Sequence, residues 1–262
     1  MTLVPSIFLF ILGLIIGSAI NALAYRIKVK KKFTKGRSFC PHCKHTLGPL
    51  DLIPVVSYLM QKGKCRYCKK KIGIHYPLIE LLTAFSFTGF YLFSGIIDPD
   101  IFATSDDLYK LIFGLVYISF LVFIILYDAK NLLILDVVVY PLIIIAFLGS
   151  WVVFQTPLDE ILMGGAVGFG FFALMHLMSR GKWIGMGDLK LGLALGLMFG
   201  LWLFLVCLFF AYIFGAAISI LMLARKKKKV GDKIPFGPFL AGAAIFTLII
   251  GPHILNWYIK FL

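Results

Sequence analysis

Long apolar runs recur along the whole chain, and they constrain its fold more than any other feature of the sequence. A helix needs about 20 mostly apolar residues to cross the hydrocarbon core of a bilayer. Eight runs qualify as spans or near-spans, at about Leu3–Tyr25, Tyr76–Gly95, Leu108–Tyr127, Leu132–Val152, Ile161–Met178, Leu189–Leu201, Leu203–Ala224 and Phe236–Trp257. The sequence therefore predicts an all-α integral membrane protein with about eight transmembrane helices.

The composition supports a bilayer as the solvent of this chain. Hydrophobic residues make up 61% of the 262 residues, whereas charged residues make up 15%, and the mean hydropathy is +0.97. Soluble domains are usually about 45–50% apolar. The formal charge of +14 would suit nucleic acid, but basic residues in a membrane protein mark the loops that stay in the cytoplasm. We expect no nucleic-acid partner, and we expect anionic lipid to face this charge.

The distribution of charge predicts the orientation. Fourteen Lys or Arg residues lie between the first two runs, so this loop should face the cytoplasm. Basic residues also follow the third, fifth and seventh runs, at Lys130, at Arg180 and Lys182, and at Arg225–Lys233. Acids follow the second and fourth runs, at Asp98, Asp100, Asp106, Asp107, Asp159 and Glu160. The pattern predicts a multi-pass membrane protein whose basic loops face the cytoplasm and whose two termini lie outside, and a seven-span count would place Arg225–Lys233 on the wrong side.

Four of the five cysteines form two CxxC pairs in the first basic loop. Cys40 and Cys43 are separated from Cys65 and Cys68 by twenty-one residues. Two such pairs supply the four thiolates of a closed, structural zinc site. The alternative is a pair of disulfides, but the cytoplasm keeps thiols reduced. The sequence therefore predicts a small zinc-binding loop domain, and His42 and His45 are possible substitute ligands.

Acids within or beside apolar runs are the strongest indication of chemistry. An Asp or Glu costs about 2.5–3.5 kcal/mol at the centre of a membrane helix, so each one is a functional hypothesis. The chain has four such acids, Glu80, Asp128, Asp136 and Asp188. In the eight-span arrangement Asp128 ends the third span and Asp188 opens the sixth, which places both at the same cytoplasmic depth. We therefore expect these two carboxyl groups to meet.

Two carboxyl groups that share a proton can act as an acid and a base, as in aspartic proteases. Asp188 follows Gly185 and Gly187, which would allow a substrate backbone to approach closely. Structural alternatives exist for each acid. Asp128 would pair with Lys130 at the membrane surface, and Asp188 would be a first-turn acid favoured by the helix dipole.

Together these features resemble the type IV prepilin peptidases, membrane aspartyl proteases that remove the leader of pilin and pseudopilin precursors. The resemblance rests on motifs in the order of that family: Gly17–Arg26, the CPHC of Cys40–Cys43, Asp51–Tyr58, the GKCRYC of Gly63–Cys68, Tyr76–Leu82, Tyr127-Asp128, Gly181–Leu191 and Ile234–Ala243.

The resemblance implies that Asp128 and Asp188 are the catalytic pair. It implies cleavage after a glycine, usually before a phenylalanine, followed in many members by methylation of the new amino terminus with S-adenosylmethionine. Residues 1–95, with the zinc loop at about 27–75, would then form the methyltransferase region. Residues 96–262 would form a six-span peptidase region.

Three residues are given secondary roles. Glu80 is a candidate for the methyl-transfer site, against the alternative of a buried acid paired with a loop lysine. Asp136 lies where the family often has a proline-aspartate pair, although Leu135 stands in place of the proline, and it is expected to be a supporting acid. Lys190 would influence Asp188 or anchor the helix at the membrane surface. Two other functions remain open, a proton-coupled transporter and a zinc-ribbon membrane scaffold.

Overall fold

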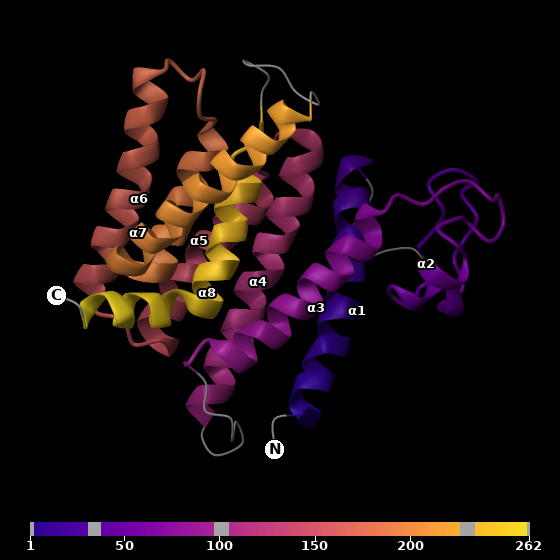
Figure 1. Ribbon diagram of the computed structural model, residues 1–262, viewed down its shortest axis with the longest axis horizontal. Coiled ribbons are helices and arrows are strands. Elements are labelled where there is room, and N and C mark those ends of the chain that lie inside the picture. Colours follow the sequence, from indigo (N-terminus) through magenta and orange to yellow (C-terminus); the bar gives the residue numbers. More distant parts are fainter. Residues whose placement is uncertain (1–2, 31–37, 97–104, 226–233, 261–262) are drawn as a thin grey trace. The chain divides into compact units, whose positions relative to one another are not determined.

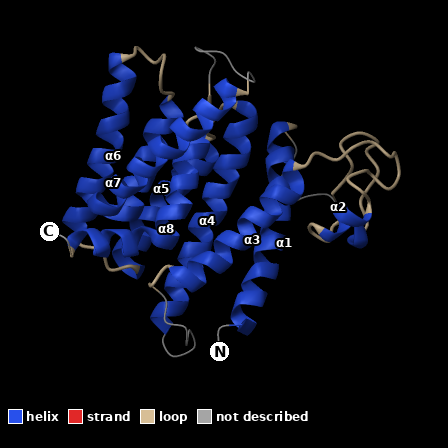
Figure 2. Cartoon of the chain, viewed as in Figure 1, coloured by secondary structure: helices blue, strands red, loops and turns tan. Residues whose placement is uncertain are grey.

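A computed structural model describes residues 3–30, 38–96, 105–225 and 234–260, and most of these residues are helical, with the main exception of the segment before α3 (Figures 1 and 2). The helices are α1 (Leu3–Lys28), α2 (Val56–Met60), α3 (His75–Phe93), α4 (Ser105–Asn131), α5 (Asp136–Leu148), α6 (Leu158–Met178), α7 (Met186–Ala224) and α8 (Gly237–Ile259), with single turns at Pro49–Asp51 and Gly149–Val153. Parts of the charge pattern that predicts the orientation lie outside the described residues, namely the basic residues within 31–37, Asp98, Asp100 and 226–233. The chain forms two compact units, Met1–Gly89 and Phe90–Leu262.

Seven of the described helices are long and apolar enough to cross a membrane. One of them, α7, has 39 residues, which would make a straight helix about 58 Å long. That is about twice the thickness of the hydrocarbon core, so α7 does not cross the membrane as one straight rod. The prediction of an all-helical membrane protein with about eight passes is confirmed once the course of α7 is followed.

Helix α7 reverses its direction at Gly200, whose φ of 67° and ψ of −174° are not helical. Before this point, Gly196 packs against Gly164 of α6, and Gly200 lies beside Glu160 at the start of α6. After it, Tyr212 of α7 reaches Met175 near the end of α6. Figure 1 shows α7 running along α6 and then turning back. The break falls one residue before the predicted end of the sixth span, close to the predicted boundary with the seventh.

Glycines bring α6 and the first part of α7 into backbone contact. Gly164 and Gly168 on α6 face Gly196 and Gly192 on α7, and a Cβ on any of the four would lie within 3 Å of a carbonyl oxygen of the opposite helix. Small residues at a spacing of four allow membrane helices to approach this closely. This close packing holds the first part of α7, whose first turn contains Asp188, against α6.

In the first unit, α1 packs against α3. Gly13 and Gly17 of α1 touch the backbone of Ala84 and Glu80 of α3. The cysteine-bearing segment connects these two helices, as Figure 1 shows. Glu80 therefore lies against α1, about one and a half turns from the start of α3.

Candidate active site and metal centre

Asp128 lies in the last turn of α4 and is 5% exposed. Its carboxylate accepts a hydrogen bond from the backbone N–H of Gly237, the first residue of α8. Helix α4 ends three residues later at Asn131, where the chain turns into α5. Burial and a backbone donor therefore hold this carboxylate at one end of the helix bundle in the second unit.

Asp188 lies in the first turn of α7, where its Oδ2 accepts the N–H of Gly185 at 3.1 Å. A carboxylate at this position caps the helix and is favoured by the helix dipole. The structural role proposed for a first-turn acid is therefore fulfilled. It leaves Oδ1 of Asp188 free of this capping bond, so capping and chemistry are compatible.

The structure brings Asp128 and Asp188 into one electrostatic environment, since their carboxylates interact through space. Ile134, in the turn between α4 and α5, lies between the two segments that carry them. Its side chain is within contact distance of a Cβ placed on Gly187 or on Gly237. Two neighbouring carboxylates do not both ionise readily, so one can hold a proton while the other accepts one.

Lys190 does not pair with Asp188, although it is only two residues away. Its Nζ lies 2.6 Å from Oδ1 of Asp136 and 4.9 Å from the centre of the Tyr140 ring. Asp136 opens α5, so this ion pair joins α5 to α7. The carboxylate of Asp136 is 61% exposed, which gives the pair little weight in stability.

Two residues beside the acids carry interactions that sequence reasoning missed. Gly237 supplies the donor to Asp128, and His176 of α6 makes a 2.7 Å hydrogen bond through Nδ1 with the carbonyl of Ile184, just before Gly185. The Pro-Phe-Gly-Pro stretch around Gly237 stands out in the sequence. The sequence does not show, however, that a backbone N–H in this stretch donates to a distant carboxylate. His176 offered no signal in the sequence, because its partner is also a backbone group.

The four paired cysteines form one cluster, as predicted. The sulfur atoms of Cys40, Cys43, Cys65 and Cys68 all lie within 4.8 Å of one another. Four sulfurs arranged around zinc at about 2.3 Å would be about 3.8 Å apart, so the cluster is of the right size. A zinc ion held here would have four sulfur ligands and would cross-link the loop.

The two CxxC turns have the same backbone design. The N–H of Cys40 donates to the carbonyl of His45, and the N–H of Cys65 donates to the carbonyl of Lys70, both at 2.9 Å. In each turn the residue after the second cysteine has a positive φ, 60° at Lys44 and 58° at Lys69. This repeated turn directs both sulfurs of a pair toward one point.

The electrostatics of the cluster favour a bound cation. Burial acts to raise the pKa of Cys40, but hydrogen bonds from the N–H groups of Cys43 and His42 and from the thiols of Cys43 and Cys65 together outweigh it and lower this pKa to about 7. The N–H of His45 acts to lower the pKa of Cys43, but burial and the sulfurs of Cys40 and Cys68 raise it to about 11. One thiolate therefore forms readily and resists the next, and a divalent cation would remove this repulsion.

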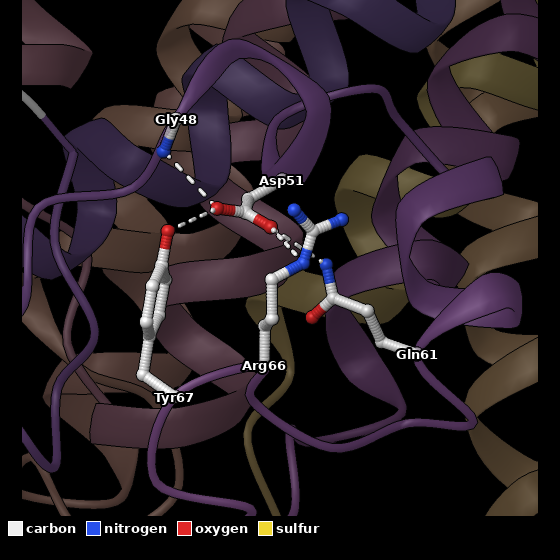
Figure 3. A network of polar contacts seen from close by, with 5 residues as sticks. All are labelled: Gly48, Asp51, Gln61, Arg66 and Tyr67. Carbon is white, nitrogen blue, oxygen red and sulfur yellow. Dashed lines mark hydrogen bonds and ion pairs between the residues drawn. The ribbon is translucent and has the colours of Figure 1, made fainter.

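Asp51 is the polar centre of the segment between the two CxxC turns, and its side chain is 3% exposed. It accepts hydrogen bonds from Gly48 N at 3.1 Å, Gln61 Nε2 at 3.0 Å and Tyr67 Oη at 3.3 Å, and Nε of Arg66 lies 3.3 Å away (Figure 3). Since Arg66 and Tyr67 lie inside the second CxxC pair, Asp51 ties the linking segment to the metal cluster.

Glu80 is 7% exposed and has partners other than the predicted lysine. Its Oε2 accepts the N–H of Val55 at 2.7 Å, and its carboxylate also bonds to the side chain of Ser18. Val55 has a φ of 60°, which is rare for a β-branched residue. Glu80 thus fixes a strained turn of the loop onto α3.

Comparison with known proteins decides the family. The prepilin leader peptidase/N-methyltransferase of Bacillus subtilis (strain 168) is 32% identical over 255 residues, covering 96% of this chain and 97% of the relative. The chain belongs to the type IV leader peptidase family. The family model of that name matches residues 115–220, and the model described as the bacterial peptidase A24 N-terminal domain matches residues 11–93.

Other relatives carry the same name. The prepilin leader peptidase/N-methyltransferase of Pseudomonas aeruginosa is 31% identical and covers 96% of the chain, and that of Aeromonas salmonicida (strain A449) is 31% identical and covers 86%. The aligned regions cover 92% of the Pseudomonas aeruginosa relative and 75% of the Aeromonas salmonicida relative. No solved structure gives a significant match. The peptidase match contains Asp128 and Asp188, whereas the N-terminal match contains the four clustered cysteines and Glu80.

Proposed function

We propose that this member of the type IV leader peptidase family is an aspartyl endopeptidase that removes the leader of prepilin or pseudopilin precursors. It cuts between glycine and phenylalanine at the cytoplasmic face of the membrane. The observation that carries the proposal is the pair Asp128 and Asp188, each oriented by a glycine N–H and electrostatically coupled to the other.

The pair suits hydrolysis by an activated water. The ionised aspartate takes a proton from water, and the resulting hydroxide adds to the carbonyl carbon of the peptide bond. The protonated aspartate then gives its proton to the leaving nitrogen, so that bond cleavage and proton transfers balance. Gly185 is exposed and leaves the approach to Asp188 open to a substrate backbone, whereas Gly187 allows Ile134 to pack closely against the start of α7.

The proposal extends to methylation of the new amino terminus, because the named relatives are both peptidases and N-methyltransferases. S-adenosylmethionine would supply the methyl group. The basic character of the segments next to α1, α4 and α6 supports a cytoplasmic location of the active site.

The test uses purified full-length protein and a leader-bearing precursor, followed by mass spectrometry. Asp128→Asn and Asp188→Asn should each abolish leader loss, whereas Asp159→Asn, which removes an exposed acid of α6, should cleave like the wild type. Full cleavage by either active-site variant would reject the assignment and would return the transporter and scaffold hypotheses to consideration. Leader loss and an added methyl group are separate mass changes, so one spectrum reports both activities.

A further inference from the structure

A second group of buried acceptors lies in the first unit, on the facing surfaces of α1 and α3. Glu80 of α3 contacts Gly17 and bonds to Ser18, and Asn21 lies one turn further along the same face of α1. Asn21 is 4% exposed, and its Nδ2 donates to the carbonyl of Tyr76 at 3.1 Å. Tyr76 precedes Glu80 by one helical turn, so the side chains of Asn21 and Glu80 both face the layer between α1 and α3.

The amide oxygen of Asn21 is buried and has no hydrogen-bond partner among the described residues. A buried polar atom without a partner costs about 1–3 kcal/mol, so such an atom in a native protein calls for a donor. About one helical turn away along the same helix faces lies the carboxylate of Glu80, which is itself an acceptor. The site therefore presents an excess of acceptors, and among the described residues no positively charged side chain is bonded to Asn21 or Glu80.

Aromatic rings border the same surface. Tyr25 lies four residues after Asn21 on α1 and stacks edge-on against Phe39, with ring centres 5.8 Å apart. Tyr25 and Tyr76 are close enough to interact electrostatically. Aromatic faces attract cations, and aromatic rings combined with a carboxylate are a common binding arrangement for ammonium groups.

We propose that Glu80 and Asn21 bind a primary ammonium group, and that its source is the amino terminus exposed when the leader is removed. The ammonium group has three donors and one positive charge, which match the orphan oxygen of Asn21 and the carboxylate of Glu80. The inference rests on the proposed function, because leader removal creates this amine. It gives Glu80 a ligand in addition to its structural bond with Val55.

The test measures binding of a peptide that needs no cleavage. Full-length protein is titrated calorimetrically with a short synthetic peptide that begins with phenylalanine, and with the same peptide acetylated at its amino terminus. The free amine should bind about tenfold or more tightly than the acetylated form, since charge-assisted hydrogen bonds are lost on acetylation. Equal affinities in the wild type would overturn the proposal without reference to any variant.

Glu80→Gln is the diagnostic variant, because glutamine keeps an oxygen for the N–H of Val55 and loses the charge. It should remove the preference for the free amine, and Asn21→Val should weaken it, whereas Asp159→Asn should keep it in full. Zinc content and unfolding temperature equal to those of the wild type show that a variant has kept its fold. A folded Glu80→Gln protein that still prefers the free amine overturns the proposal.

The source of the ammonium is tested separately. S-adenosylhomocysteine is added as a competitor to the wild type and to Glu80→Gln, each with the free-amine peptide bound. If it displaces the peptide from the wild type but not from Glu80→Gln, the site binds the amino group of the methyl donor, which would overturn our proposal. The titration is repeated with Asp128→Asn, where the preference should persist. A wild type that prefers the free amine but never cleaves a precursor would reject the proposed peptidase function alone.

Discussion

A methyl group at the Cα of Gly237 would lie 2.5 Å from Oδ2 of Asp128. The same methyl would lie 3.1 Å from Cδ1 of Ile134. The start of α8 therefore approaches Asp128 so closely that an added methyl group would displace the carboxylate, and the N–H of Gly237 is the donor to that carboxylate. The position of Asp128 depends on this contact from a helix more than a hundred residues away in the sequence.

Gly237→Ala is expected to reduce cleavage about a hundredfold, since displacements of about 1 Å at a catalytic group have effects of this size. Gly242→Ala in the same helix is the matched control, because no heavy atom lies within 4 Å of the added methyl. Both variants are assayed on a leader-bearing precursor with protein of equal zinc content. Cleavage by Gly237→Ala at the rate of Gly242→Ala would show that Asp128 does not depend on this contact.

The ion pair between Asp136 and Lys190 should matter far less than the two active-site acids. Asp136→Asn is expected to change the free energy of unfolding by no more than about 1 kcal/mol, because exposed ion pairs contribute little. Cleavage should fall a few-fold at most. Steady-state kinetics of Asp136→Asn beside Asp188→Asn provide the comparison. Complete loss of cleavage in Asp136→Asn, as in Asp188→Asn, would make Asp136 a member of the catalytic group.

The helices and the cysteine cluster could be predicted from the sequence, because both depend on local patterns. Apolar length determines a span, and the CxxC spacing determines how two sulfurs meet. Even the reversal within α7 was predicted, since a cluster of basic residues after it required an additional pass. The described backbone turns at Gly200, one residue before the predicted end of the sixth span.

Partners that come from distant segments could not be predicted in the same way. Lys190 was expected to influence Asp188 or to anchor the helix, yet it pairs with Asp136, which lies 54 residues earlier. Glu80 was expected to pair with a lysine if it was only structural, yet it binds the N–H of Val55. In both cases the charge of the residue is compatible with several partners. The packing between helices and loops determines which partner is used.

Removing a ligand sulfur should remove the metal. Cys40→Ser is expected to contain much less than one zinc per chain and to lose the fold of the segment between the two CxxC turns, because the site supplies much of the folding energy of so short a segment. Cys207→Ala is the control, since Cys207 is buried in α7 and belongs to the other unit. Metal analysis of both proteins is decisive. A full zinc content in Cys40→Ser would exclude a four-sulfur site.

The reversal of α7 can be tested through Gly200. Its φ of 67° and ψ of −174° fall in a region that is essentially restricted to glycine, and a Cβ there would lie 3.0 Å from Cγ of Glu160. Gly200→Ala should therefore lower the free energy of unfolding by about 1–3 kcal/mol. Thermal unfolding in detergent measures the change.

Gly170→Ala provides the comparison within α6. Gly170 is exposed and helical, and no heavy atom lies within 4 Å of an added methyl. Alanine at such a site should stabilise the helix by about 0.4–1 kcal/mol, because it restricts the unfolded chain. Opposite signs for the two substitutions would show that the backbone turns at Gly200, as an eighth pass requires. If Gly200→Ala stabilised the protein, α7 would continue through this position as a regular helix. Asp188 and Arg225 would then lie far apart, at the opposite ends of one straight helix.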